Sequence, residues 1–296
     1  MRSRLAGAAV VGALFLFMFI PAALRAMETD VFVVRDLTGK LSVDRQAALA
    51  KEAREKLDKV LRFYDASPKI EKLGKIKLEF DEPRGGTYST VFLMVKEDNR
   101  KGRVVRIFGV DKEPQMVAHK LTHAIFISPD KLVRNMMGIP MEVRFGNPLT
   151  FPMCGFRSDE WVEAFHRKQS YIPLSDLGPD HEQWGMSTRG GVPVVLDKPR
   201  QHVMYAESGS FGEYLLASHG AEKMKRFWRL SEGGQRPWEE VFGLPLKDLE
   251  ALWLQSLKAK KPDEKHVEAL LNLLNRNPKD ACSEAQRLSG TAAAGK

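Results

Sequence analysis

The sequence contains very little cysteine. Cys154 and Cys282 are the only two among 296 residues. No cysteine comes directly after the apolar run near the start, so a lipid anchor of the bacterial lipoprotein kind is not indicated. In an oxidising compartment the two residues could form one disulfide, and the alternative is a pair of free, buried thiols. The sequence leaves both open, because a disulfide requires the two Cα atoms to come within reach in the fold.

Charged residues are absent from Leu5 to Leu24. Two arginines precede this stretch, and Pro21 and small residues lie at its end, which is the layout of a secretory signal cleaved near Ala23 or Ala26. The alternative is an uncleaved anchor, since a spanning helix needs roughly 20 residues. We expect residues 1–26 to be a signal peptide or signal anchor. The rest is then exported, periplasmic or secreted, and touches a membrane only if residues 5–24 remain as an inner-membrane anchor.

A large excess of one charge is also absent. Without the arginines of residues 1–26, the 46 basic residues become 43 against 38 acidic ones, so the net charge falls from +8 to about +5. The basic residues alternate with acids, as in "KEAREKLDK", which is typical of solvated helix faces. We therefore expect no nucleic-acid partner. The segment "SGSFG" lacks the flanks of a nucleophile elbow, and "PRGGTYS" lacks the lysine of a phosphate-binding loop.

The first half of the chain alternates strand-like and helical patterns. Residues 30–36 (DVFVVRD) predict a strand, and Ser42–Asp65 predict an amphipathic helix with Ser42 as its N-cap. Two further strands are predicted at residues 74–82 (GKIKLEFDE) and Arg103–Val110, separated by glycine-rich and polar segments. A helix, two strands and a further helix around residues 117–126 give an α+β order, in which the sheet leans on that last helix.

The second half is interrupted and then helical. Four prolines predict a loop lobe from Ile127 to Gly155, followed by a helix over Arg157–Gln169 with Ser158 or Asp159 as its cap. The segment Tyr171–Val203 is again rich in loop residues. From Tyr205 the pattern predicts helices, with Gly220 and Gly233 as C-caps, a last helix at residues 264–277, and a disordered small-residue tail "GTAAAGK".

Two histidines stand four residues apart in "VAHKLTHAIF". This spacing puts the imidazoles of His119 and His123 on one face of a helix, where a zinc ion could bridge them. Lys120 stands between them, at the position where a zinc peptidase requires glutamate. A pair of this kind is weak evidence without context, and the alternative is two histidines satisfied by hydrogen bonds in a core without metal.

Further segments supply the context. "AHKLTHAIF" is similar to the "AHELTHxxF" pattern of zinc peptidases, and a helix with Glu160 and Glu163 follows it, then the turn "YIPLSDL". A helical block begins at "YAESGSFGEYLL" and ends in "FGLPLKDLEALWLQSL". Over most of Val60–Leu257 the chain thus resembles the peptidase MA-like branch of the gluzincins. The resemblance implies an α+β fold, a zincin-like domain of a small sheet plus an active-site helix, with a helical C-terminal lobe.

The resemblance also implies a set of zinc ligands, which makes zinc a candidate cofactor. His119 and His123 match the two imidazoles, and the third ligand is a glutamate of the next helix, best matched by Glu160 and alternatively by Glu163. Trp161 departs from the family, which has glycine after the glutamate so that the backbone can pack closely.

Lys120 is the more serious departure from that family. Its position belongs to the general base, which takes a proton from the metal-bound water, and an ammonium has no lone pair for this step. A desolvated, neutral lysine is the conceivable exception. His202 and Tyr205 lie where related enzymes often have a donor to the oxyanion, and the alternative is that they pack the loop on the C-terminal helices.

These observations lead to one organisation and three functional hypotheses. After the signal, residues 27–155 form an N-terminal α+β zincin-like lobe, residues 156–260 a mainly helical lobe, and residues 261–296 a terminal helix and tail. The first hypothesis is a catalytically degenerate zinc-peptidase homologue that binds a polypeptide or envelope partner, with Arg103–Val110 as the edge strand for an extended peptide. The others are an active zinc metallopeptidase with a non-standard base, and a structural envelope protein on a zincin scaffold.

Overall fold

The computed structural model describes residues 26–66, 74–82, 90–95, 101–112, 114–189 and 192–294. The expected signal segment lies outside these residues, apart from Ala26. Within the described ranges, no helix combines the length and the apolar character that crossing a bilayer requires.

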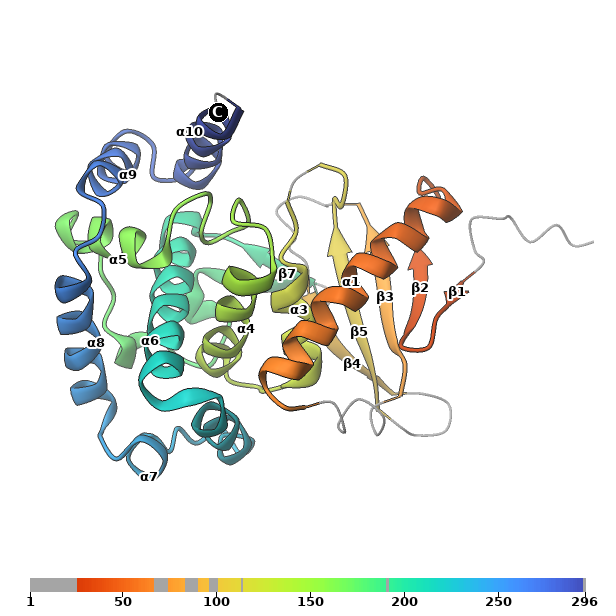
Figure 1. Cartoon of the computed structure of the whole chain (residues 1–296), viewed down its shortest axis with the longest axis horizontal. Helices are drawn as coiled ribbons and strands as arrows, with labels where there is room; N and C mark the ends of the chain where they lie inside the picture. Colours follow the sequence, from red (N-terminus) through yellow and green to blue (C-terminus); the bar gives the residue numbers. More distant parts are fainter. Residues whose placement is uncertain are drawn as a thin grey trace, which may run out of the picture.

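A five-stranded sheet forms one end of the molecule, with the strand order β1-β2-β3-β5-β4 (Figure 1). The strands are β1 (Met27–Glu28), β2 (Phe32–Asp36), β3 (Ile76–Asp81), β4 (Thr90–Val95) and β5 (Lys101–Phe108). Strands β2, β3 and β5 are mutually parallel, whereas β1 and β4 run antiparallel to their neighbours. The expected α+β class is confirmed, and the three predicted strands correspond to β2, β3 and β5.

The prediction that Arg103–Val110 forms an edge strand is wrong. These residues belong largely to β5, which lies between β3 and β4, with Val105 opposite both Leu78 and Val91. The edge is β4, whose short apolar sequence "TVFLMV" stands between two polar segments and is not among the predicted strands. Strands β4 and β5 are consecutive and antiparallel, so they lie side by side, and β4 pairs with the side of β5 that was expected to be the free edge.

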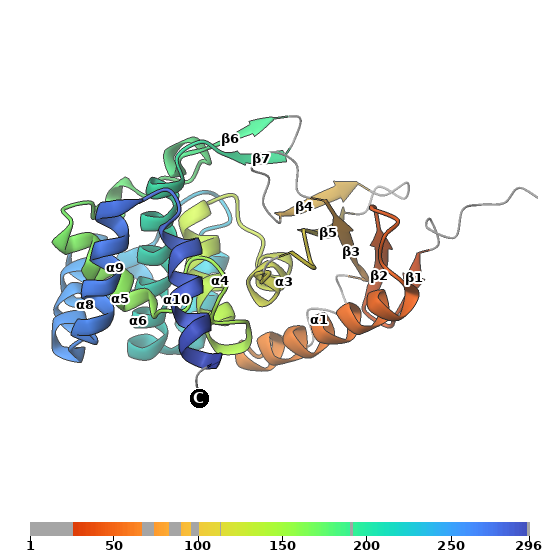
Figure 2. The ribbon, with the colours of Figure 1, turned by 90° about the horizontal axis from the view of Figure 1, so that it is seen from above.

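Helices α1 (Val43–Phe63) and α3 (Val117–Ile125) lie on the same side of the sheet (Figure 2). As predicted, Ser42 caps α1, with its Oγ accepting a hydrogen bond from the backbone N–H of Arg45 at 3.1 Å. The buried face of α1 repeats at helical spacing and comprises Leu49, Ala50, Ala53, Leu57, Val60 and Leu61. It shares one hydrophobic core with apolar residues of β2, β3, β5 and α3, including Phe32, Leu78, Ile107 and Leu121.

The predicted loop lobe from Ile127 to Gly155 contains a helix, α4 (Lys131–Phe145). Asp130 caps it by accepting hydrogen bonds from the N–H groups of Leu132 and Val133. Pro140 lies inside the helix, and burial of the surrounding methionines and isoleucine outweighs the hydrogen bond that a proline removes. Helix α6 packs closely there, since a Cβ on its Gly212 would lie only 2.5 Å from the carbonyl oxygen of Met136.

The remaining elements form a helical half. These are α5 (Ser158–Arg167), the short turns η2 (Leu174–Asp176) and η3 (Glu182–Trp184), the hairpin β6–β7 (Met186–Arg189 and Val192–Val195), α6 (Lys198–Leu230), α7 (Trp238–Phe242), α8 (Leu246–Lys260), α9 (Glu264–Arg276) and α10 (Ala281–Ala294). Figure 2 shows the hairpin on the side of the molecule where β4 forms the edge of the sheet.

Details of this half correct three predictions. The N-cap of α5 is Arg157, not Ser158 or Asp159. Gly220 interrupts α6 at a φ of 81°, as a C-cap would, whereas the last residue of α6 is Leu230 and its C-cap is Ser231, not Gly233. The tail expected to be disordered is helical as far as Ala294, since it continues α10, whose Ala281 and Ala285 belong to one core cluster with apolar residues of α9.

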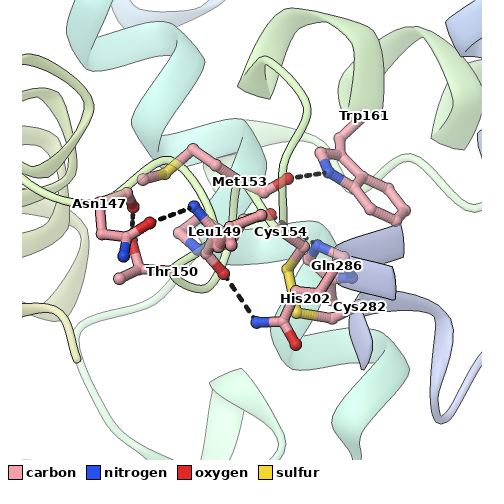
Figure 3. The surroundings of a disulfide bond; sticks show 10 residues. Asn147, Leu149, Thr150, Met153, Cys154, Trp161, His202, Cys282 and Gln286 are labelled. Atoms are coloured by element: carbon pink, nitrogen blue, oxygen red, sulfur yellow. Dashed lines mark hydrogen bonds between the residues drawn. A yellow bond between two sulfur atoms is a disulfide. The ribbon is translucent and has the colours of Figure 1, made fainter. Parts of the chain in front are cut away.

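Cys154 and Cys282 form a disulfide, with their Cα atoms 5.3 Å apart (Figure 3). This decides between the two alternatives that the sequence left open. The bond ties the segment before α5 to α10, and backbone carbonyls of that segment are held on either side. Trp161 Nε1 donates to the carbonyl of Met153 and Gln286 Nε2 to that of Leu149, both at 2.7 Å.

Candidate functional site

The two predicted histidines lie side by side on α3, as their spacing requires. Their ring centroids are 4.1 Å apart with the rings edge to face, and His119 is fully buried. Helix α3 follows β5 directly and packs between the sheet and α4. The sequence therefore predicts correctly that the pair shares one face of a helix.

Helix α4 closes over this pair at Gly138. A Cβ at that position would lie 2.9 Å from Nε2 of His123 and 3.1 Å from Cδ2 of His119. Only glycine allows the backbone of α4 to come this close to both rings. The space beside the imidazoles is therefore taken by protein backbone.

The hydrogen bond of His123 fixes its tautomer. Its Nε2 lies 2.9 Å from the carbonyl oxygen of Arg134. A carbonyl only accepts, so Nε2 must carry the proton, and its lone pair is not free for a metal. Both ring nitrogens of His119 are buried and have no hydrogen-bond partner among the described residues. Burial lowers the pKa of both histidines well below 6.5, with further lowering by nearby cations, so both rings are neutral.

The predicted third ligand is not brought to the histidines. Glu160 accepts a hydrogen bond from the backbone N–H of Arg157 at 2.9 Å and lies 3.1 Å from Nδ1 of His266, on α9. Glu163, the alternative, pairs with Arg167 one turn later on α5. Glu160 occupies the first turn of its own helix, where the free backbone N–H groups attract a carboxylate. The prediction of a His119, His123 and Glu160 ligand set is therefore wrong.

A different glutamate reaches α3, and no local sequence pattern predicts it. Glu142 of α4 is completely buried and accepts from the backbone N–H of His119 at 3.0 Å and that of Asn147 at 3.2 Å. It binds the first turn of α3, which has no side-chain cap of its own. Burial raises its pKa, and these hydrogen bonds oppose the rise. Glu142 thus holds the backbone of α3 and does not face the rings as a ligand.

Cationic side chains, not acidic ones, gather around the pair. Lys120 comes from α3, and Lys131 and Arg134 come from α4. Their charges are close enough that Arg134 lowers the pKa of both lysines, after the larger effect of burial. They also act on His181, whose pKa falls to about 4, first through burial and then through Lys131, Arg134 and Lys120. We call Lys120, Lys131 and Arg134 the cationic cluster.

Lys131 contacts a methionine sulfur, a tyrosine hydroxyl and two aromatic rings. Its Nζ donates to the hydroxyl of Tyr205 and lies against the sulfur of Met186, both at 3.1 Å. It also stands 5.2 Å from the ring centroid of Trp184 and 5.0 Å from that of Tyr205, within cation–π range. Burial lowers its pKa well below 10.5.

Of the two predicted oxyanion donors, one lies beside the histidine pair and the other does not. Tyr205 lies beside the pair, with its ring stacked 6.3 Å from that of His119. His202, one turn earlier on α6, points the other way: its Nε2 bonds the carbonyl oxygen of Pro152 at 2.9 Å, and its ring packs on Trp161 beside the disulfide (Figure 3). The packing alternative is correct for His202.

The residues around the histidine pair do not fit zinc. Among the described residues, no three histidine, cysteine, aspartate or glutamate side chains come together in a way that could hold a metal ion. One imidazole nitrogen is committed to a carbonyl, and three cations lie where a divalent ion would be repelled. Comparison with protein-family models, curated proteins and solved structures finds no match for this chain. What the site does must therefore be argued from its own residues.

Proposed function

We propose that this chain is an exported pseudopeptidase, a binding protein on a zincin-like scaffold that has lost zinc-dependent hydrolysis and binds an extended polypeptide. One observation carries the proposal: a lysine stands in the position of the general base, and the histidines beside it are enclosed by the cationic cluster and the backbone of α4. Such a centre can attract a ligand but has no group poised to activate water.

The order of elements supports the scaffold. A small mixed sheet ends in the antiparallel edge strand β4, and β5 leads directly into the helix that carries the histidine pair. That agrees with the small sheet plus active-site helix that the resemblance to gluzincins implies.

The chemistry supports the loss of hydrolysis. A zinc peptidase needs three protein ligands and a carboxylate that accepts a proton from the bound water. Lys120 provides no such acceptor while it is protonated, and Glu142, whose carboxylate reaches the first turn of α3, binds backbone N–H groups. Loss of a general base alone lowers a rate by about 10²- to 10⁴-fold, and a missing ligand adds to that.

A second candidate, hydrolysis with Lys120 as the base, has one observation in its favour. Burial lowers the pKa of Lys120 to about 8, so about one amine in ten is neutral at pH 7. A neutral amine is a competent base. This candidate still requires a metal that the surrounding residues do not fit.

Zinc analysis and hydrolysis together test the catalytic half of the proposal. Purified mature protein, Lys120→Glu and His119→Ala are each dialysed with excess zinc, and the metal content and the hydrolysis of a fluorogenic peptide mixture are measured. We expect less than one zinc per chain and no turnover in any of the three. One zinc per chain that His119→Ala removes, with hydrolysis gained in Lys120→Glu, would overturn the proposal.

The edge of the sheet is the place to test peptide binding. An added strand would pair with β4, whose other side is already paired with β5. Backbone N–H groups of adjacent residues point in opposite directions along a strand, so Leu93→Pro and Met94→Pro each remove a different one. We expect the substitution that removes the outward N–H to abolish binding of an unfolded, labelled polypeptide while the protein stays folded. Unchanged binding in both variants would refute a role for this edge.

A further inference from the structure

One face of α4 carries the donors of the candidate site. Lys131, Arg134, Asn135 and Gly138 follow the i, i+3, i+4, i+7 pattern, which puts them on a single face of the helix. Contacts of Arg134 and Gly138 with the histidines show that this face is turned towards α3. Lys120, on α3, is close enough to act electrostatically on Lys131 and to be acted on by Arg134.

Two donors on this face have no partner in the part of the chain that the structure describes. The Nε of Arg134 and the Nδ2 of Asn135 are buried and have no hydrogen-bond partner among the described residues. Buried donors of this kind are uncommon in native proteins, and each requires a reason, such as a ligand that supplies the acceptor. The Arg134 side chain keeps some solvent exposure, so a small ligand can reach it.

The nearby carboxylates are already engaged. Asp130 receives two hydrogen bonds from Arg236, at 2.7 and 3.1 Å, besides capping α4. Glu142 acts on Lys120 electrostatically, but its oxygens accept from backbone N–H groups of α3 and the following loop. The positive charges of the cationic cluster therefore repel one another in a buried place, and the nearby carboxylates neutralise them only in part. A bound anion would reduce that repulsion.

We infer that the cationic cluster of Lys120, Lys131 and Arg134 is a binding site for a carboxylate group. The planar fork of an arginine suits the two oxygens of a carboxylate, and buried lysines beside it add charge. The rings of Trp184 and Tyr205 lie 5.2 and 5.0 Å from Lys131 Nζ, and such planar neighbours favour a flat, singly charged group over a larger tetrahedral one. The inference rests on the proposed function only for the source of the carboxylate, an acidic side chain or C-terminus of the bound polypeptide.

Small anions test the site without a peptide. Thermal unfolding is followed at pH 7 and constant ionic strength with sodium acetate, sodium succinate, sodium phosphate or sodium chloride. We expect acetate and succinate to raise the midpoint above the chloride value and phosphate to have a smaller effect, because a ligand of the folded state stabilises it. Arg134→Gln should weaken the apparent affinity for succinate about 10- to 100-fold.

Two further variants make this result specific. Arg134→Lys keeps the charge and should retain part of the effect, which excludes a general loss of folding as the cause. Lys51→Met removes an exposed lysine of α1 and should behave like the wild type. A rise with phosphate alone would overturn the choice of carboxylate, and equal midpoints in all four salts would overturn the site itself.

A peptide arm separates this inference from the proposed function. Binding of a labelled peptide with one glutamate is compared with that of the same peptide carrying glutamine, in the wild type and in Arg134→Gln. A preference for glutamate that Arg134→Gln abolishes identifies the polypeptide as the source of the carboxylate. Stabilisation by succinate without any peptide binding would keep the site and reject the polypeptide partner.

Discussion

Replacing Lys120 by methionine should stabilise the folded protein at neutral pH. Burial, helped by Arg134, lowers the pKa of Lys120 from 10.5 to about 8. As the pH falls, the unfolded chain therefore takes up this proton first, and the folded state loses stability from about pH 10.5 until the loss is complete below about pH 8. The gap corresponds to about 3 kcal/mol at pH 7.

Methionine has a similar length and no charge, so it removes this penalty. The pKa of about 8 already includes the attraction of Glu142, and fitting a different side chain into the core has a cost of its own, so the expected gain is about 1–3 kcal/mol in the free energy of unfolding. Urea unfolding at pH 7 and pH 10, with chloride as the only added anion, measures it. At pH 10 the gain should fall below about 1 kcal/mol, because the folded-state lysine is then neutral and pH 10 lies only about half a unit below the unfolded pKa of 10.5, so most of the penalty has gone.

The exposed Lys51→Met variant is the matched control and should change little at either pH. Two results would refute the reasoning. A Lys120→Met protein that is less stable at pH 7 would mean that the ammonium is compensated by a partner, and an equal gain at both pH values would mean that the gain comes from packing and not from charge.

Three further substitutions test the framework around the site, each by urea or thermal unfolding. Gly138→Ala should destabilise the protein by about 1–3 kcal/mol, because the new Cβ would lie 2.9 Å from Nε2 of His123, whereas Gly290→Ala in α10 meets nothing within 4 Å and should be neutral or stabilising. Cys282→Ser removes a bond that closes 128 residues and should lower stability by about 4–5 kcal/mol, an effect that a reducing agent should reproduce in the wild type. Ser42→Ala loses the cap of α1 and should cost about 1 kcal/mol, and an unchanged midpoint would mean that α1 is held by packing alone.

Local sequence patterns predict those elements whose stability signals lie within the element itself. Helix α1 has a polar cap and an apolar residue at every turn, and β2, β3 and β5 have runs of branched and aromatic residues. The histidine pair belongs to the same class, since two residues one turn apart must share a face of the helix. These features required no knowledge of the rest of the chain.

Features that depend on distant contacts were not predictable. Prolines around α4 favour a loop, but contacts with distant helices stabilise it as a helix. The hydroxyl of Tyr64, the C-cap residue of α1, donates to the carbonyl of Met137, and Gly212 of α6 packs on Met136. Glu160 matched a zinc ligand by its place in the sequence, yet its carboxylate bonds the start of its own helix and His266, more than 100 residues away. A match in sequence position alone does not determine which residues a side chain contacts in the fold.

The lysine between the histidines connects these results. In the zinc peptidases on which the proposed function is based, a divalent cation beside the two imidazoles polarises a carbonyl oxygen of the substrate. Here Lys120, Lys131 and Arg134 supply positive charge in the same neighbourhood from side chains, and α4 approaches so closely at Gly138 that the rings are covered. An electropositive centre without a metal can still bind the oxygens of a polypeptide, but it cannot generate a hydroxide. The proposed function, binding without cleavage, requires a site of this kind, which keeps positive charge and has no metal ion.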